Sequence, residues 1–365
     1  MGFPAQDTPM RATPPLLALC LLCPALHAAQ QPPLRSPTPP ERRGTQGPIH
    51  MVFDMHCDPW SNNQSLAQKW ALYDAWLGNI DWLLVELQPY DVPVGFSSVG
   101  PFMEMVVSQG SSGDGAAILQ RIYQTGAQIG VHSHTEWRQS AFNWPTYGYT
   151  GYSFAQAERN WLDATSWVEA GILTAFGGNP PRPLADIRDH REYHIPLEND
   201  WALALFSQLG YSVGAKIPKE FYGWYDHYVW NPLRPSAVNF LVEDPSTSAT
   251  MVSVGRVIGL EGSANQDQDM TAPNVKRMFL QLYLNWRHAD RTGAPEKIWN
   301  WGLAVHAHDI DPGEPSRTAI EDVVPWLYER FSNRVEPTGS RVFEWDTHQD
   351  VVAEFEAWEA RYRGA

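Results

Sequence analysis

The sequence contains few cysteines, and most of them lie near its start. Only 3 of the 365 residues are cysteine. Cys20 and Cys23 fall in an N-terminal apolar segment that we expect to be removed, which would leave Cys57 alone. No intramolecular disulfide could then form, so packing must stabilise the core. A single cysteine on a strand is typical of a small buried residue and not of a nucleophile.

Basic residues are also scarce. The 26 lysines and arginines stand against 41 aspartates and glutamates, which gives a net charge of −15. A chain this acidic repels phosphate backbones and anionic lipid headgroups, and its sequence has no basic patch. We therefore expect no nucleic-acid partner. Hydrophobic residues at 43% and charged residues at 18% are the balance of a globular protein.

The N-terminal region has no apolar run long enough to span a bilayer. Its longest run covers residues 16–26 and contains Pro24. Arg11 precedes this run and the small residues Ala28 and Ala29 follow it, which is typical of a secretory signal peptide. We predict a signal peptide over residues 1–29, a Pro-rich linker over residues 30–48, and export to the periplasm or the medium with no membrane span in the mature chain. A disordered cytosolic tail is the alternative.

From residue 49 onward, short apolar runs alternate with segments of helical period, which is typical of βα units. There is no repeat of solenoid length and no Gly-rich phosphate loop after the first predicted strand. The sequence therefore predicts an α/β fold, a distorted (β/α)7-8 barrel that forms a single catalytic domain over residues 49–362. The predicted strands cover residues 49–54, 93–99, 128–134, 171–176, 212–217, 251–258, 301–308 and 341–345. The predicted helices cover residues 73–88, 116–125, 154–168, 200–209, 273–287, 317–331 and 349–361.

Three of the predicted strands end in polar residues at alternating positions, so that each set shares one face of its strand. The sets are Asp54, His56 and Asp58; His132, His134 and Glu136; and His306 and His308. In a parallel barrel these strand ends meet at one rim, while the apolar residues between them face the helices. Histidine and carboxylate side chains together bind zinc or a similar divalent metal that activates water. The pattern predicts a metallohydrolase.

Four stretches in this order resemble the polysaccharide deacetylase family with the NodB homology domain. They are VFDMHCD at 52–58, LLVELQPYDVPVGFSSVGPFMEM at 83–105, ILQRIYQTGAQIGVHSHTEW at 118–137 and LAVHAHD at 303–309. The resemblance covers roughly residues 49–360 and implies a distorted (β/α) barrel that removes N-acetyl groups from a carbohydrate. By this resemblance, Asp54 matches the general base, His132 the first histidine ligand and His308 the general acid.

Two positions depart from the family pattern. Met55 stands where the family has a metal-binding aspartate, and Glu136 stands where it has its second histidine. Either His56 or Asp58 would replace the aspartate, and either His134 or Glu136 would supply the remaining ligand. The predicted metal ligands are therefore drawn from four residues, of which at most three bind at once: His56, Asp58, His132 and His134. Zinc is the expected metal. The family's arginine motif has two candidate matches, Arg182 and Arg234, and salt bridges explain either one equally well.

The chain is rich in large aromatic residues, with 17 tryptophans against 9 methionines. Many of them fall in two predicted loops, at residues 142–152 and 221–230. Flat apolar rings with polar edges suit stacking on sugars. We predict that Trp137, Trp144 and Trp224 bind the substrate, an N-acetylated glycan or a small acetylated sugar. Packing of these loops against the barrel explains the aromatic residues equally well.

Two other functions fit parts of the sequence. DMHCDPW at 54–60 resembles the H-x-D-L-P-W start of membrane dipeptidases, although the later ligand motifs of that family are missing. An amidohydrolase or dipeptidase is therefore one alternative. Met55 motivates the other, a degenerate barrel that binds a glycan without cleaving it. Metal content separates these classes, because a pure binding module should purify without stoichiometric metal.

Overall fold

The computed structural model describes residues 46–61, 63–148, 152–185, 202–214, 232–236, 252–254, 256–259 and 271–364. The predicted signal peptide and the linker up to residue 45 lie outside these ranges, so what the sequence indicates about them stays a prediction. In the described part of the chain, no helix combines the length and the apolar composition needed to cross a membrane.

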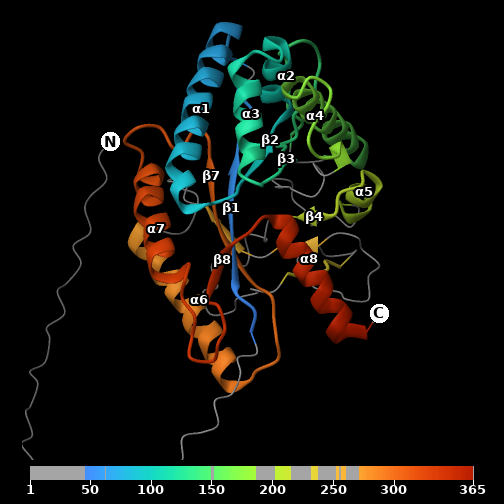
Figure 1. The fold of residues 1–365 in the computed structure, drawn as a ribbon. Helices are drawn as coiled ribbons and strands as arrows, with labels where there is room; N and C mark the ends of the chain where they lie inside the picture. Colours follow the sequence, from blue (N-terminus) through green and yellow to red (C-terminus); the bar gives the residue numbers. More distant parts are fainter. Residues whose placement is uncertain are drawn as a thin grey trace, which may run out of the picture. The chain divides into compact units, whose positions relative to one another are not determined.

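A parallel sheet of six strands forms the centre of the fold (Figure 1). The strands are β1 (Ile49–His56), β2 (Val94–Ser98), β3 (Ile129–Val131), β6 (Arg256–Gly259), β7 (Trp299–His306) and β8 (Phe343–Trp345). Their order is β3-β2-β1-β7-β6, and β8 also pairs with β1. β7 pairs along all of β1, while β8 pairs with its first half and β2 with its second half. A separate parallel pair joins β4 (Val213–Gly214) and β5 (Val252–Ser253).

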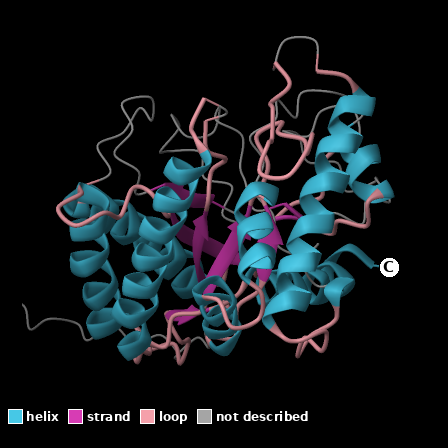
Figure 2. Ribbon diagram, turned by 90° about the horizontal axis from the view of Figure 1, so that it is seen from above, coloured by secondary structure: helices cyan, strands magenta, loops and turns pink. Residues whose placement is uncertain are grey.

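Helices flank the strands on both sides (Figure 2). They are α1 (Leu66–Leu87), α2 (Gly100–Gln109), α3 (Asp114–Gln124), α4 (Phe154–Ala175), α5 (Ala202–Gln208), α6 (Ala272–Thr292), α7 (Pro315–Phe331) and α8 (His348–Glu359), with a 3₁₀ turn at Gln88–Tyr90 and a π-helical turn at Ala360–Gly364. Ser65, Ser153 and Thr347 begin α1, α4 and α8 with capping boxes, which satisfy backbone N–H groups of the first turn. Helices packed on parallel strands confirm the predicted α/β class.

One predicted strand was wrong, and one helix was missed. The predicted strand at residues 171–176 is the last part of α4, because an apolar run this short has the same pattern in a buried strand and a buried helix. At Gly171 α4 packs closely on α2, since a Cβ there would lie 2.6 Å from Sδ of Met103. Helix α2 itself was not predicted. Its residues are buried continuously from Gly100 to Val106, so they show no helical period.

The two faces of β1 and β7 differ in character. The odd-numbered residues are large and apolar and join the main core. They are Ile49, Met51, Phe53 and Met55 of β1, and Trp299, Trp301, Leu303 and Val305 of β7. On the other face, Val52 and Ala304 belong to a smaller core with Val351 and Phe355 of α8. The predicted alternation is therefore confirmed, because Asp54 and His56 share the face opposite the main core. Cys57 is also in the main core and fully buried, as predicted.

A buried carboxylate ties α6 to the segment that follows α7. Glu336 is 4% exposed and accepts hydrogen bonds from Tyr283, from Arg287 Nε at 2.9 Å, from Arg291 Nη2 at 2.9 Å and from Arg334 Nε at 3.2 Å. Burial by itself raises the pKa of Glu336, but the hydrogen bonds from Tyr283, Arg291 and Arg287 outweigh it and lower the pKa to about 2. The carboxylate therefore stays ionised over most of the pH range.

We expect Glu336→Gln to lower the free energy of unfolding by about 1–3 kcal/mol at pH 7, because hydrogen bonds to a charged group are lost. The pKa of Glu336 lies below its ordinary value of 4.5, so its stabilising effect is complete above that value and disappears as the pH falls toward about 2. Urea unfolding at pH 7 and pH 3 should show a smaller difference at pH 3. The control Glu329→Gln, at an exposed site of α7, should change stability by less than about 0.5 kcal/mol. A difference that grows on acidification would contradict this account.

Candidate metal centre

Backbone hydrogen bonds hold the ends of the central strands side by side. The N–H of His132, just after β3, donates to the carbonyl oxygen of Ser98 at the end of β2, at 2.9 Å. The N–H of Ala307, just after β7, donates to the carbonyl oxygen of His56 at 2.9 Å. All these strands run parallel, so their carboxyl ends lie at one edge. Residues from all three polar sets predicted from the sequence therefore meet there.

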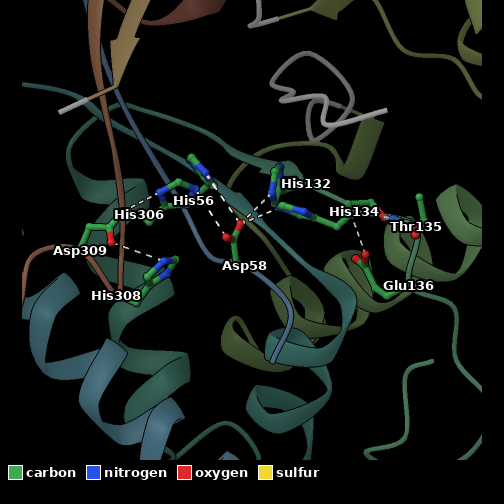
Figure 3. Close-up of polar contacts among 10 residues, drawn as sticks. His56, Asp58, His132, His134, Thr135, Glu136, His306, His308 and Asp309 are labelled. Carbon is green, nitrogen blue, oxygen red and sulfur yellow. Dashed lines mark hydrogen bonds and ion pairs between the residues drawn. The ribbon is translucent and has the colours of Figure 1, made fainter. Parts of the chain in front are cut away.

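Asp58 lies at the centre of this edge, with histidines on both sides (Figure 3). Its Oδ1 atom is 3.2 Å from Nε2 of His132 and 2.8 Å from Nε2 of His134. Its Oδ2 atom is 3.6 Å from Nε2 of His306, and Nε2 of His56 lies 3.9 Å from Oδ1. His132 is fully buried, whereas the side chain of Asp58 is 24% exposed. The carboxylate is thus the point on which four imidazoles converge.

The charge states of these groups suit a divalent metal. Burial raises the pKa of Asp58, but hydrogen bonds from His132 and His134 and the nearby His306 outweigh it and hold the pKa well below its usual range. Burial lowers the pKa of His132 to about 3, and the neighbouring His56 and His134 act in the same direction. At neutral pH Asp58 is therefore ionised and His132 is neutral. These are the forms in which a carboxylate and an imidazole bind a metal.

His306 was not among the predicted ligands. Its Nδ1 atom lies 2.8 Å from Oδ2 of Asp309, and Oδ1 of Asp309 lies 3.5 Å from Nε2 of His308. His308 is half-buried; burial lowers its pKa, and Asp309 opposes this effect. The sequence did contain a signal for His306, because it shares one strand face with His308. Its pairing opposite His56 in the sheet became visible only in the structure.

Of His134 and Glu136, the two candidates for the remaining ligand, His134 is the one whose side chain contacts Asp58, at 2.8 Å. Glu136 is fully buried and accepts a 2.7 Å hydrogen bond from the backbone N–H of His134. Burial raises the pKa of Glu136 to about 7. Thr135 lies between them with φ of +105°, a region that β-branched residues rarely adopt. This bend ends the strand-like alternation, so Glu136 turns back toward its own loop while His134 contacts Asp58.

Helix α4 fixes the loop that carries these residues. Asn160 is fully buried in α4, and its amide nitrogen donates to Oγ of Ser133 at 2.5 Å and to the carbonyl oxygen of Glu136. The hydroxyl of Tyr152 donates to the amide oxygen of Asn160 at 2.9 Å. One amide side chain therefore holds the loop at residues 133 and 136, on either side of His134.

The structure does not support the predicted role of Trp144 in substrate binding. Its side chain is 2% exposed, and its Nε1–H donates to Oε2 of Glu104 at 2.7 Å. Its ring packs against Gly100, where a Cβ would overlap it. Glu104 also accepts from the backbone N–H of Phe142 and from Nη2 of Arg138, so it anchors the whole loop. Trp144 is a packing residue.

The structure gives less information about three other predicted site residues, Trp137, Trp224 and Asp54. Trp137 is half-buried, and its ring stacks on Tyr147 and lies under the Arg159 guanidinium, 3.8 Å from the ring centre. A sugar would compete with these contacts. Trp224 lies outside the described residues. Asp54 is fully buried on β1, two residues before His56, and its catalytic role stays a prediction.

The two candidate arginines have structural partners. Arg182 donates to the backbone carbonyl oxygens of Gly126 and Ala127 at 2.6 and 2.9 Å. Arg234 pairs with Glu359 of α8 at 2.9 Å. The predicted salt bridge is therefore found for Arg234, whereas the partners of Arg182 are backbone carbonyl groups.

We expect Trp144→Ala to reduce the free energy of unfolding by about 3–5 kcal/mol, because it leaves a cavity in a buried site and removes the partner of Glu104. Trp137→Ala should cost less, since that ring is partly exposed. Chemical denaturation of both variants measures the difference. A Trp144→Ala protein with wild-type stability and weakened binding of N-acetylglucosamine oligomers would restore the stacking role.

The fold has counterparts among solved structures. A protein from Mycobacterium smegmatis and one from Pseudomonas aeruginosa PAO1, both assigned as polysaccharide deacetylases, align over 90% of this chain and 94% and 95% of their own, with a TM-score of 0.50 and 11% identity. The chain shares the fold of the polysaccharide deacetylases. The Puue allantoinase aligns equally well, with a TM-score of 0.50 and 11% identity over 90% of this chain and 94% of its own. No protein-family model matches the sequence, and no curated protein matches it.

This deacetylase fold confirms the resemblance that the sequence motifs predicted. At 11% identity, the comparison supports the architecture and leaves the chemistry to the side chains. Within the described residues, groups of histidine and carboxylate donors that fit a metal occur at the carboxyl edge of the sheet, including Asp58 with His132 and His134. The fold and this donor set are the basis for the function proposed below.

Proposed function

We propose that this protein is a metal-dependent hydrolase that removes N-acetyl groups from a carbohydrate outside the cytoplasm. The observation that carries the proposal is the position of Asp58, 2.8 Å from Nε2 of His134 and 3.2 Å from Nε2 of His132, at the carboxyl edge of a sheet with a deacetylase-like fold. Export rests on the signal-like apolar run at residues 16–26. Because the net charge of −15 repels phosphate backbones, we propose no nucleic-acid partner.

Asp58, His132 and His134 would hold the divalent ion. One carboxylate and two imidazoles leave coordination positions open, as in catalytic zinc sites, and zinc is the metal we propose. When bound, such an ion polarises the acetamide carbonyl and activates a water molecule. Met55 does not contradict this site, because Asp58 supplies the carboxylate three residues further along the chain.

The remaining steps belong to the chain's own acid and base. We assign Asp54 as the base that takes a proton from the attacking water, whose oxygen bonds to the amide carbon. The C–N bond then breaks, and His308 gives a proton to the departing nitrogen. Acetate and a free amino sugar are the products. His308 is partly exposed, and although burial lowers its pKa, the Asp309 carboxylate 3.5 Å away opposes this effect and can stabilise the proton that His308 donates.

Elemental analysis combined with acetate release tests this function. The purified full chain should contain divalent metal and release acetate from N-acetylglucosamine oligomers. His132→Ala/His134→Ala should lose this metal and reduce acetate release by at least about 100-fold, because both imidazole ligands are gone. His288→Ala, which removes an exposed imidazole of α6, should match the wild type.

Two results would redirect the proposal. Bound metal without acetate release would leave the metal centre in place and move the substrate to other amides, for which a dipeptide and allantoin are the compounds to assay. Allantoin is included because the Puue allantoinase shares the fold. A wild-type protein without metal that still binds the oligomers would instead identify a glycan-binding barrel.

A further inference from the structure

Four imidazoles, and not two, surround the Asp58 carboxylate. Besides His132 and His134, His56 at the end of β1 and His306 at the end of β7 point toward it (Figure 3). Oδ1 of Asp58 lies within 3.9 Å of Nε2 atoms from three of these histidines. One carboxylate oxygen has two lone pairs, so it cannot accept hydrogen bonds from three imidazoles at once. Cations placed between the donor atoms would use all of them.

The donors form two sets that share Asp58. One set is Asp58 with His132 and His134, and the other is Asp58 with His56 and His306. Within each set, the donor atoms lie within 4.8 Å of one another. The two pairs of histidines stand on opposite sides of the carboxylate (Figure 3). Oδ2 faces His306 at 3.6 Å, whereas Oδ1 contacts His132 and His134 and lies 3.9 Å from Nε2 of His56. Nitrogen donors therefore face both oxygens of the carboxylate.

His306 is oriented as a metal ligand would be. Its Nδ1 atom lies 2.8 Å from Oδ2 of Asp309, so the ring proton belongs on Nδ1. The lone pair of Nε2 then points toward Asp58. Metal-binding histidines usually donate their other ring N–H to a carboxylate in this way, which fixes the tautomer and the ring orientation. His56 and His306 also lie close together, with ring centres 3.7 Å apart.

We propose that this site holds two divalent ions bridged by the Asp58 carboxylate, the second bound by His56 and His306. Ions in two-metal sites lie about 3.5–4 Å apart, a separation that the two oxygens of one carboxylate can bridge. Imidazole and carboxylate donors suit zinc and similar metals at both positions. The inference rests on the proposed function for the first ion, bound with His132 and His134, and adds a second.

Metal counting tests the second ion without any activity assay. The full chain is stripped with a chelator, reloaded with Zn²⁺, desalted and analysed for zinc per chain. We expect two ions in the wild type, one in His306→Ala and one in His56→Ala. His288→Ala should keep both ions, since its imidazole lies on the exposed side of α6. Thermal unfolding of each variant verifies that it is folded.

Loading with Mn²⁺ gives a second readout that needs no variant. Two Mn²⁺ ions bridged by a carboxylate give an exchange-coupled electron paramagnetic resonance spectrum, whereas one isolated ion gives six lines. We expect the coupled spectrum in the wild type and the six-line spectrum in His306→Ala. If a variant fails to fold, the zinc content and the Mn²⁺ spectrum of the wild type still show whether the site holds one ion or two.

The outcomes separate this inference from the proposed function. One zinc ion per wild-type chain, unchanged in His306→Ala, would leave the proposed function standing and overturn the second ion. No zinc in the wild type would overturn both. Two ions that persist in His56→Ala and His306→Ala would place the second ion elsewhere and also overturn the inference. The group formed by His50, Glu344 and Asp346 would then be the next position to test.

Discussion

The pairing of β1 with its neighbours is the constraint on which the site depends. β7 lies along its whole length in register, which sets His306 directly beside His56. On the other edge, β2 pairs with the second half of β1 and in turn carries β3, whose end leads into His132. A slip of one residue in this register would turn the polar side chains into the main core. The hydrophobic packing of the opposite face therefore fixes the position of the donors.

Much of this arrangement could be predicted from sequence because it follows strand periodicity. The alternation between Asp54 and His56 on one side and Phe53 and Met55 on the other needs only a strand with two buried faces. The meeting of three strand ends follows from parallel pairing. The resemblance to the deacetylase family indicated which residues at the strand ends have functional roles. Because Met55 stands where that family has a metal-binding aspartate, Asp58 became a candidate to supply the carboxylate.

The features of the fold and the site that the sequence did not predict depend on contacts between segments far apart in the chain. The bend at Thr135, which separates His134 from Glu136, is a backbone conformation that residue identity does not predict. The burial of Trp144 depends on Gly100 and Glu104, about 40 residues earlier in the chain. From sequence alone, an aromatic loop that packs inside the protein cannot be distinguished from one that stacks on a sugar. Helix α2 has no polar face, so its sequence lacks the hydrophobic period by which a helix is recognised.

Helix α4 makes two contacts that are separated by a fixed number of residues. Asn160 holds the loop that carries His134, and eleven residues later Gly171 fits against Met103 of α2. Each residue of an α-helix turns the chain by about 100°. A single insertion or deletion between these two positions would therefore rotate one contact away from its partner, whatever residue was added or removed. Relatives with this site should vary in sequence along that stretch of α4 but keep its length.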